Sequence, residues 1–372
     1  MFDLNGLGRL PEGYRLPDWA DYVELRCLLD LDGHYSADRL ATAMRGEADF
    51  TGSLVPDDAQ RDDATAAQAD SVEELLEAVT DDELLGGDAE LDDVLPVEVV
   101  PASPVEELLE LTYGRAAEEF DSVEEYAERV FAVIASRAER LSELYPFKVD
   151  SANREVSLAF ADSHAHKHYV FYLASSLLRY VKRTDAIRLT GEFEILSVTV
   201  MRKLLGEAPE IDLYGTARRG LPSRFTGGPF ERLEALAKAL RGKVGAEEGD
   251  FHPRDSADNG LDIVAWFPMA DEAKGVPVLF AQCACGIKWE YKQYEASWKR
   301  WKEFLSLASA PIEVVLVPHM FRSTHTRWYV DTEVSGVLID RERALKALQR
   351  TDCEEDLQVL VNEIRGSKEV AA

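Results

Sequence analysis

The sequence predicts an α/β protein in which a C-terminal mixed sheet flanked by helices follows a mainly α-helical N-terminal region. In the N-terminal half, apolar residues recur at helical spacing. In the C-terminal half, residues 261–267 and 276–282 form two apolar runs of strand length, separated by a short polar turn. Asn259-Gly260 is a strong turn signal just ahead of the first run. Helical patterns before and after the two strands complete the α/β prediction.

The 372 residues divide by composition into four predicted units. We expect a small helical module at residues 1–55, an acidic flexible linker at 56–103, a helical domain at 104–185 and an α/β domain at 186–372. The linker is predicted because its Ala- and Asp-rich sequence has no apolar periodicity and ends in several prolines.

Each N-terminal helix is predicted from a start signal followed by apolar periodicity. Residues 19–30 carry apolar side chains at helical spacing, and Ser36 is expected to cap a second helix. Ser122 is followed by Glu125 three residues later, which is the sequence of a capping box at the start of another helix. A further long helix is expected over residues 167–181.

The net charge of −29 argues against nucleic acid as a partner only if the acidity is spread evenly. Residues 46–114 hold 21 acidic residues and one basic residue, a net charge of −20. From residue 187 to the end there are 25 basic and 29 acidic residues, so this half can carry a basic groove. The acidic segment is either a solvated spacer or an arm that mimics nucleic acid or docks on a basic partner.

Composition and hydropathy limit the cellular setting. A hydrophobic content of 46% is ample for a packed core. No apolar run approaches the roughly 18 residues that cross a bilayer, and the N-terminus lacks the pattern of a signal peptide. Four cysteines suit a reducing compartment better than a disulfide framework. We expect a cytoplasmic protein without a membrane partner.

Three histidines at alternate positions, His164, His166 and His168, leave two interpretations open. A spacing of two does not place side chains on one face of a helix, as a metal site there would need. The favoured interpretation is an ordinary polar helix start, and the alternative is a metal-binding or pH-sensing cluster.

Glu194 is a candidate site residue because of its place in a predicted helix. Thr190 is expected to cap a helix over residues 191–205. Glu194 then heads a row of apolar residues, so its carboxylate leads into a buried face, which costs free energy unless a cation compensates. Glu192 is the weaker candidate, because an acid in the first turn is already stabilised by the helix dipole.

Polar residues interrupt both predicted strands. Asp262 lies in the first apolar run and Gln282 ends the second. A suitable antiparallel register makes them neighbours, and with the backbone carbonyl of Cys283 they form a set of hard oxygen ligands for Mg²⁺ or Mn²⁺. Lys292, at the start of the following helix, can then orient the attacking water.

The sequence resembles the PD-(D/E)XK, or restriction-endonuclease-like, nuclease superfamily. The resemblance is closest to bacterial defence-associated members with the pattern Gly-Leu-Asp-Val/Ile-Val-Ala-Trp … Gln-Cys-Ala-x-Gly-x-x-Trp-x-x-Lys, and it covers about residues 190–348. In that family a helix bearing an acid precedes a strand bearing Asp, a strand bearing Glu or Gln, and a helix. By this resemblance Glu194, Asp262, Gln282 and Lys292 are catalytic, and Glu194 joins the metal ligands. It also implies a core strand at residues 311–318 and a closing helix that opens at 339–343.

The sequence departs from the family pattern in its third motif. Where Glu-x-Lys is usual, Gln282-Cys283-Ala284 has an amide for the acid and alanine for the lysine. The lysine function therefore falls to Lys292, with Lys288 as the runner-up and as a substrate contact. Arg218 and Arg219, in a loop rich in Gly and Arg, are candidate contacts to the phosphate backbone.

The resemblance implies a metal-dependent endonuclease, a phosphodiester hydrolase that cleaves DNA in a bacterial antiphage or restriction-type system. The chain has no P-loop, so we expect a helicase or ATPase partner, and a homo-oligomer is possible for a double-strand cut. The alternative is a non-catalytic interaction subunit with a degenerate nuclease fold.

Two further motifs have competing interpretations. Cys283 and Cys285 lack the two additional ligands that a zinc site needs. Tryptophans and tyrosines alternate with bases over residues 288–302, which are expected to form one helix. These aromatic residues either pack on the sheet, as we favour, or stack on nucleic acid.

Overall fold

The fold is taken from a computed structural model that describes residues 4, 7, 9–11, 13, 15–46, 122–214, 223–247, 249, 260–322, 327–330 and 334–367. The predicted acidic linker at 56–103, Arg218 and Arg219 lie outside these residues. Among the helices described, none combines the length and the apolar character needed to cross a membrane.

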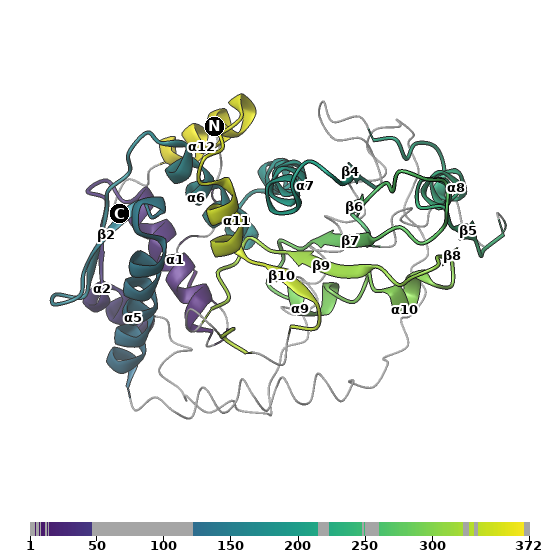
Figure 1. Cartoon of the computed structure of the whole chain (residues 1–372). Helices are drawn as coiled ribbons and strands as arrows, with labels where there is room; N and C mark the ends of the chain where they lie inside the picture. Colours follow the sequence, from purple (N-terminus) through teal and green to yellow (C-terminus); the bar gives the residue numbers. More distant parts are fainter. Residues whose placement is uncertain are drawn as a thin grey trace, which may run out of the picture.

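A five-stranded mixed sheet forms the centre of the C-terminal half (Figure 1). Its strand order is β10-β9-β7-β6-β4. β4, β6 and β7 are antiparallel neighbours, whereas β7, β9 and β10 run parallel. The two predicted strands are confirmed as adjacent, and β9 confirms the strand expected at residues 311–318. The strands are β4 Glu210–Leu213, β6 Ile263–Trp266, β7 Val278–Cys283, β9 Ile312–Leu316 and β10 Val337–Ile339.

Helices cover both faces of this sheet, and alternate side chains of each strand point to opposite faces. Ile263 and Ala265 of β6 belong to the core on one face, which includes α7, Arg183–Leu205. Val264 and Trp266 belong to the core on the other face, which includes α8, Pro229–Ala239. Two short helices, α9 Trp289–Lys292 and α10 Trp298–Trp301, lie on the side of the sheet away from α7 in Figure 1. A small ladder joins β5 Lys243–Val244 to β8 Leu305–Ser306.

Two helix predictions in this half are wrong in their boundaries. The helix that carries Glu194 begins at Arg183, not after Thr190, and the Thr190 hydroxyl instead donates to Ile187 O at 3.1 Å. The single helix expected over residues 288–302 is broken by turns at 293–297. The first difference removes the reason for discounting Glu192, which lies in the middle of α7 and is buried.

The N-terminal region contains helices near those expected, together with a small sheet that the helical prediction missed. The helix expected over residues 167–181 begins earlier and ends at Ser175. Ser36, Ser122 and Ser163 cap their helices by accepting from backbone N–H groups at 3.2 Å. The sheet has the order β1-β3-β2 and is antiparallel. The elements are α1 Leu16–Leu29, β1 His34–Ser36, α2 Ala37–Gly46, α5 Val123–Leu141, β2 Phe147–Asp150, β3 Glu155–Leu158 and α6 His164–Ser175, with 3₁₀ turns at Ser142–Leu144 and Leu178–Tyr180.

Residues before and after the acidic segment fold together. β1, from the predicted module at 1–55, pairs with β3, from the predicted domain at 104–185. Arg45, at the end of α2, forms an ion pair with Glu124, at the start of α5. The same apolar core also includes residues of α11, Arg341–Leu348, and α12, Glu355–Gly366, the first of which confirms the closing helix.

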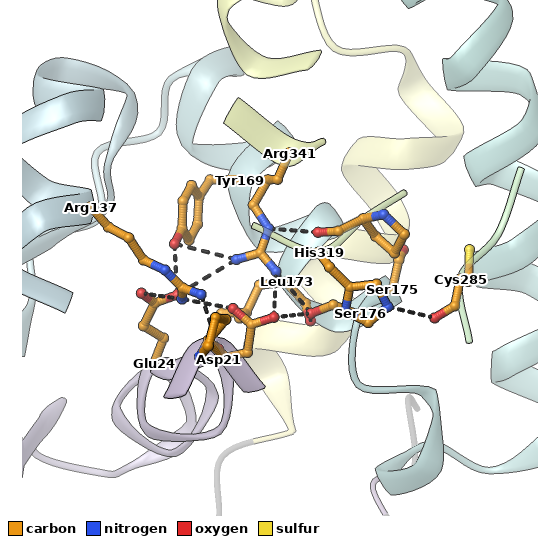
Figure 2. A network of polar contacts seen from close by, with 12 residues as sticks. Asp21, Glu24, Arg137, Tyr169, Leu173, Ser175, Ser176, Cys285, His319 and Arg341 are labelled. Carbon is orange, nitrogen blue, oxygen red and sulfur yellow. Dashed lines mark hydrogen bonds and ion pairs between the residues drawn. The ribbon is translucent and has the colours of Figure 1, made fainter. Parts of the chain in front are cut away.

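A buried polar network joins the N-terminal helices to α11 (Figure 2). Arg137 donates to Asp21 and Glu24 at 2.7 and 2.9 Å, and Arg341 donates to Asp21 at 2.8 Å. The hydroxyl of Tyr169 donates to Glu24 at 2.6 Å. Burial would raise the pKa of Asp21, but Arg341 and Arg137 outweigh this effect, and the net shift is downward. The network therefore favours the ionised form of Asp21 and binds three distant parts of the chain together.

Candidate functional site

Asp262 lies immediately before β6, beside the C-terminal end of β7. Its backbone N–H donates to Ala281 O at 3.1 Å, and its carboxylate accepts from the backbone N–H of Cys283 at 2.6 Å. The two partners, Ala281 and Cys283, are the residues immediately before and after Gln282. The expected neighbourhood of Asp262 and Gln282 is therefore present, and it depends on the antiparallel pairing of β6 with β7.

Gln282 is a buried amide whose two ends have different surroundings. Its side chain is on the face of β7 that includes Phe280, and the residue is 3% exposed. The amide Nε2 donates to a carboxylate oxygen of Glu295 at 2.7 Å. The amide oxygen, Oε1, is buried and has no hydrogen-bond partner within the described parts of the chain. We call this atom the open amide oxygen, and it is a possible ligand for a cation or a water.

Glu194 lies on the opposite face of the sheet from Gln282. The Cys283 side chain packs with the core that includes α7, because neighbouring residues of a strand point to opposite faces. Burial raises the pKa of the Cys283 thiol well above its usual value, and the carboxylates of Asp262 and Glu194 raise it further. Asp262 thus lies close to both Gln282 and Cys283, whereas the sheet separates Glu194 from the Gln282 side chain.

The two candidate lysines flank α9. Lys292 is the last residue of this single helical turn rather than part of a first turn, and it is half-buried. Lys288 precedes the helix and is exposed. Both lysines belong to the segment that connects Gln282 with Glu295.

His319 and Glu295 contribute to the site but were not predicted from the sequence. His319 follows β9 and is buried, and its Nε2 lies 3.2 Å from the carbonyl oxygen of Cys285 (Figure 2). The same atom lies 3.1 Å from the carbonyl oxygen of Gly286. Because carbonyls only accept, Nε2 carries the proton. Burial lowers the pKa of His319, so its neutral form is favoured. His319 therefore fixes the turn that follows Gln282 and Cys283.

The oxygen atoms at this site fit a hard divalent cation better than zinc. The open amide oxygen of Gln282 is a buried oxygen that needs a partner, and the carboxylate of Asp262, which accepts from the N–H of the next residue, Cys283, supplies charge at the same strand end. Within the described ranges, no group of three or more His, Cys, Asp or Glu side chains is arranged to hold a metal. A cation here would therefore rely on amide and backbone oxygens in addition to carboxylates. Neither the cysteine pair nor the histidine cluster provides such a group.

The histidine cluster is a helix start. Ser163 caps α6, and the three rings have separate environments. His164 Nδ1 accepts from Cys353 N at 2.8 Å, and His166 Nδ1 accepts from Ala161 N at 2.9 Å. His168 is 1% exposed, and burial lowers its pKa to about 4.

The aromatic residues of the α9–α10 segment divide into two groups. Trp289 and Trp301 are each 1% exposed and belong to the cores against the sheet, as the packing interpretation predicts. Tyr291 and Tyr294 are 41% and 48% exposed. Stacking on a nucleic acid base thus remains open for the tyrosines and is excluded for these two tryptophans.

No protein-family model, curated protein sequence or solved structure shows significant similarity to this chain.

Proposed function

We propose that the protein is a metal-dependent nuclease that hydrolyses DNA phosphodiester bonds at the paired ends of β6 and β7. The observation that carries the proposal is the open amide oxygen of Gln282 at a strand end where the next residue, Cys283, donates its N–H to the Asp262 carboxylate. Carboxylate and amide oxygens are ligand types that Mg²⁺ and Mn²⁺ prefer, and within the described residues this amide oxygen has no hydrogen-bond partner.

The order of the elements gives further support. α7 bears Glu194, Asp262 immediately precedes β6, Gln282 is in β7, and α9 ends at Lys292. This is the order that the resemblance to the PD-(D/E)XK superfamily implies. We therefore propose a restriction-endonuclease-like arrangement for the five-stranded sheet and its helices.

Each residue has a role in this proposal. Asp262, Gln282 and the Cys283 carbonyl would hold Mg²⁺ or Mn²⁺, and the ion would stabilise charge on the phosphate and activate water. Lys292 would orient the attacking water, with Lys288 contacting the DNA backbone. Glu194 lies near the Cys283 thiol, on the face of the sheet that α7 covers. It would contribute negative charge to the end of β7 from that face.

Replacing Asp262 with asparagine tests the proposal. We expect the rate of DNA cleavage to fall by at least about 10²–10³-fold, because the change removes the charge of a metal ligand. Asparagine can still accept the hydrogen bond from Cys283 N, so the fold should be preserved. The measurement is cleavage of plasmid and linear DNA with Mg²⁺ or Mn²⁺, with and without chelator.

The matched control is Asp32→Asn, a change at an exposed aspartate in the N-terminal region, which should leave cleavage unchanged. Equal cleavage by Asp262→Asn and wild type, or no cleavage by the wild type with either metal, would refute the proposal. The second outcome would favour a non-catalytic interaction subunit. That alternative is supported by the amide and the alanine in the third motif.

A comparison of Lys292→Ala with Lys288→Ala separates a catalytic role from a role in DNA binding. We expect Lys292→Ala to lower the cleavage rate at saturating DNA by about 10²-fold, which is typical of one electrostatic contact in the transition state. Lys288→Ala should instead weaken DNA binding and make the salt dependence shallower, because one phosphate contact is lost. If only Lys288→Ala abolishes cleavage at saturating DNA, the two roles are reversed.

The proposed setting follows from the resemblance and from the charge distribution. We propose a cytoplasmic enzyme of a bacterial antiphage or restriction-type system that works with a helicase or ATPase and acts as a homo-oligomer when it cuts both strands. The concentration of acidic residues in positions 46–114 leaves the C-terminal half nearly neutral and compatible with DNA binding.

A further inference from the structure

We propose that Glu295 is a positioning residue that fixes the Gln282 amide and supplies the negative charge missing from the third motif. This inference deepens the proposed function and depends on metal binding at the same site. It assigns a role to a residue that lies 13 positions after Gln282, beyond the predicted motif.

The contact between Glu295 and Gln282 determines which end of the amide faces the site. A carboxylate only accepts hydrogen bonds, so the Gln282 Nε2 must be the atom that faces Glu295, at 2.7 Å. The open amide oxygen is then directed away from Glu295 in a side chain that is 3% exposed. Without Glu295, the amide could turn over and present N–H groups, which repel a cation, where the oxygen now lies.

The position of Glu295 is set by the turn after α9 and by its close approach to Gly260. Its N–H donates to Lys292 O at 2.9 Å, which closes the turn after α9. Gly260 has a φ of +75°, and a Cβ at this position would lie 2.4 Å from the Glu295 Cβ. Glycine is therefore required here for Glu295 to approach the start of the Asp262 segment. Glu295 thus contacts the chain on the β6 side and the Gln282 side chain of β7.

The charge of Glu295 compensates for the amide in the motif. A glutamine in place of glutamate removes one negative charge from the ligand set. The Glu295 carboxylate restores that charge at one remove, because it is hydrogen-bonded to the N–H of the ligand amide and does not contact the metal itself. Its negative charge also draws electron density toward the amide oxygen. Partners of this kind orient metal ligands and increase their basicity.

The test is Mn²⁺ binding by the full-length protein without DNA, measured by titration of free Mn²⁺ with electron paramagnetic resonance. Glu295→Gln should weaken Mn²⁺ binding by about 10- to 100-fold, the range found when a ligand's hydrogen-bond partner is removed. The charge-swapped variant Gln282→Glu/Glu295→Gln keeps both the hydrogen bond and the net charge. It should recover the affinity of the wild type or exceed it.

Glu303→Gln is the matched control, since Glu303 is an exposed acid in the same segment and its loss should leave Mn²⁺ affinity unchanged. Wild-type affinity in Glu295→Gln, or no Mn²⁺ binding by the wild type, would overturn the role of Glu295. If the single variant unfolds, failure of the charge-swapped variant to bind Mn²⁺ would also overturn it. Mn²⁺ binding that depends on Glu295 without DNA cleavage would instead refute the nuclease proposal and leave this inference intact.

Discussion

Replacing Arg341 with methionine is expected to lower the free energy of unfolding by about 3–5 kcal/mol, the cost of removing one partner from a buried ion pair. Arg341 is fully buried, and it donates to Asp21 and to Ser176 Oγ at 2.8 Å and to Pro318 O at the same distance. Methionine fills the space but leaves the Asp21 carboxylate with less compensation in a buried position. Urea denaturation followed by circular dichroism measures the loss.

A second replacement shows whether the cost comes from the uncompensated charge. Asp21→Asn in the same protein removes the carboxylate charge that Arg341→Met leaves without its partner. The loss of unfolding free energy in the double variant should therefore be smaller than the sum of the losses in the two single variants. Arg350→Met, at an exposed position in the turn after α11, is the control and should change stability by less than about 0.5 kcal/mol. Additive effects of the two network changes would contradict the interpretation of Asp21 and Arg341 as an interacting pair.

Acidification from pH 6.5 to pH 4 is expected to lower the stability of the wild type through His168. Burial, and to a smaller extent His164, lower the pKa of His168 from 6.5 to about 4 in the folded protein. In this pH window the unfolded chain takes up a proton that the folded chain does not, so stability falls as the pH falls. The difference between the two pKa values corresponds to about 3 kcal/mol.

His168→Gln should remove this part of the pH dependence. The free energy of unfolding of the variant, measured by urea denaturation at several pH values, should change by about 3 kcal/mol less than that of the wild type between pH 6.5 and pH 4. The comparison uses the change with pH within each protein, so a constant loss of stability in the variant does not affect it. Parallel pH profiles for the two proteins would contradict the prediction.

Local signals in the sequence predicted those parts of the fold that depend on local interactions. The serine caps and the two apolar strands are examples, because a cap and a continuous apolar run are specified by neighbouring residues. The small sheet was missed because none of its short strands is a continuous apolar run, and β1 pairs with β3 more than 100 residues later. Such pairing is decided by the packing of the helices rather than by the sequence of either strand.

The candidate site shows the same division between local and distant effects. Asp262 and Gln282 were predicted as neighbours because two adjacent antiparallel strands bring them together. Glu295 was missed because its approach to Gln282 requires α9 to end after one turn, which the continuous run of helix-compatible residues at 288–302 does not indicate. The position of Glu194 across the sheet from Gln282 depends on which face α7 covers, and periodicity within one helix does not specify this.

The pairing of β1 with β3 and the ion pair between Arg45 and Glu124 place residues that precede and follow the acidic part of the sequence in one folded region. The entropy of closing a flexible loop grows only with the logarithm of its length, so doubling the number of residues costs about 0.6 kcal/mol. By this relation, a change in the number of residues between Arg45 and Glu124 is expected to cost the fold little stability. Residues 46–114 carry −20 of the chain's net charge of −29, so the net charge can change independently of the sheet and the candidate site.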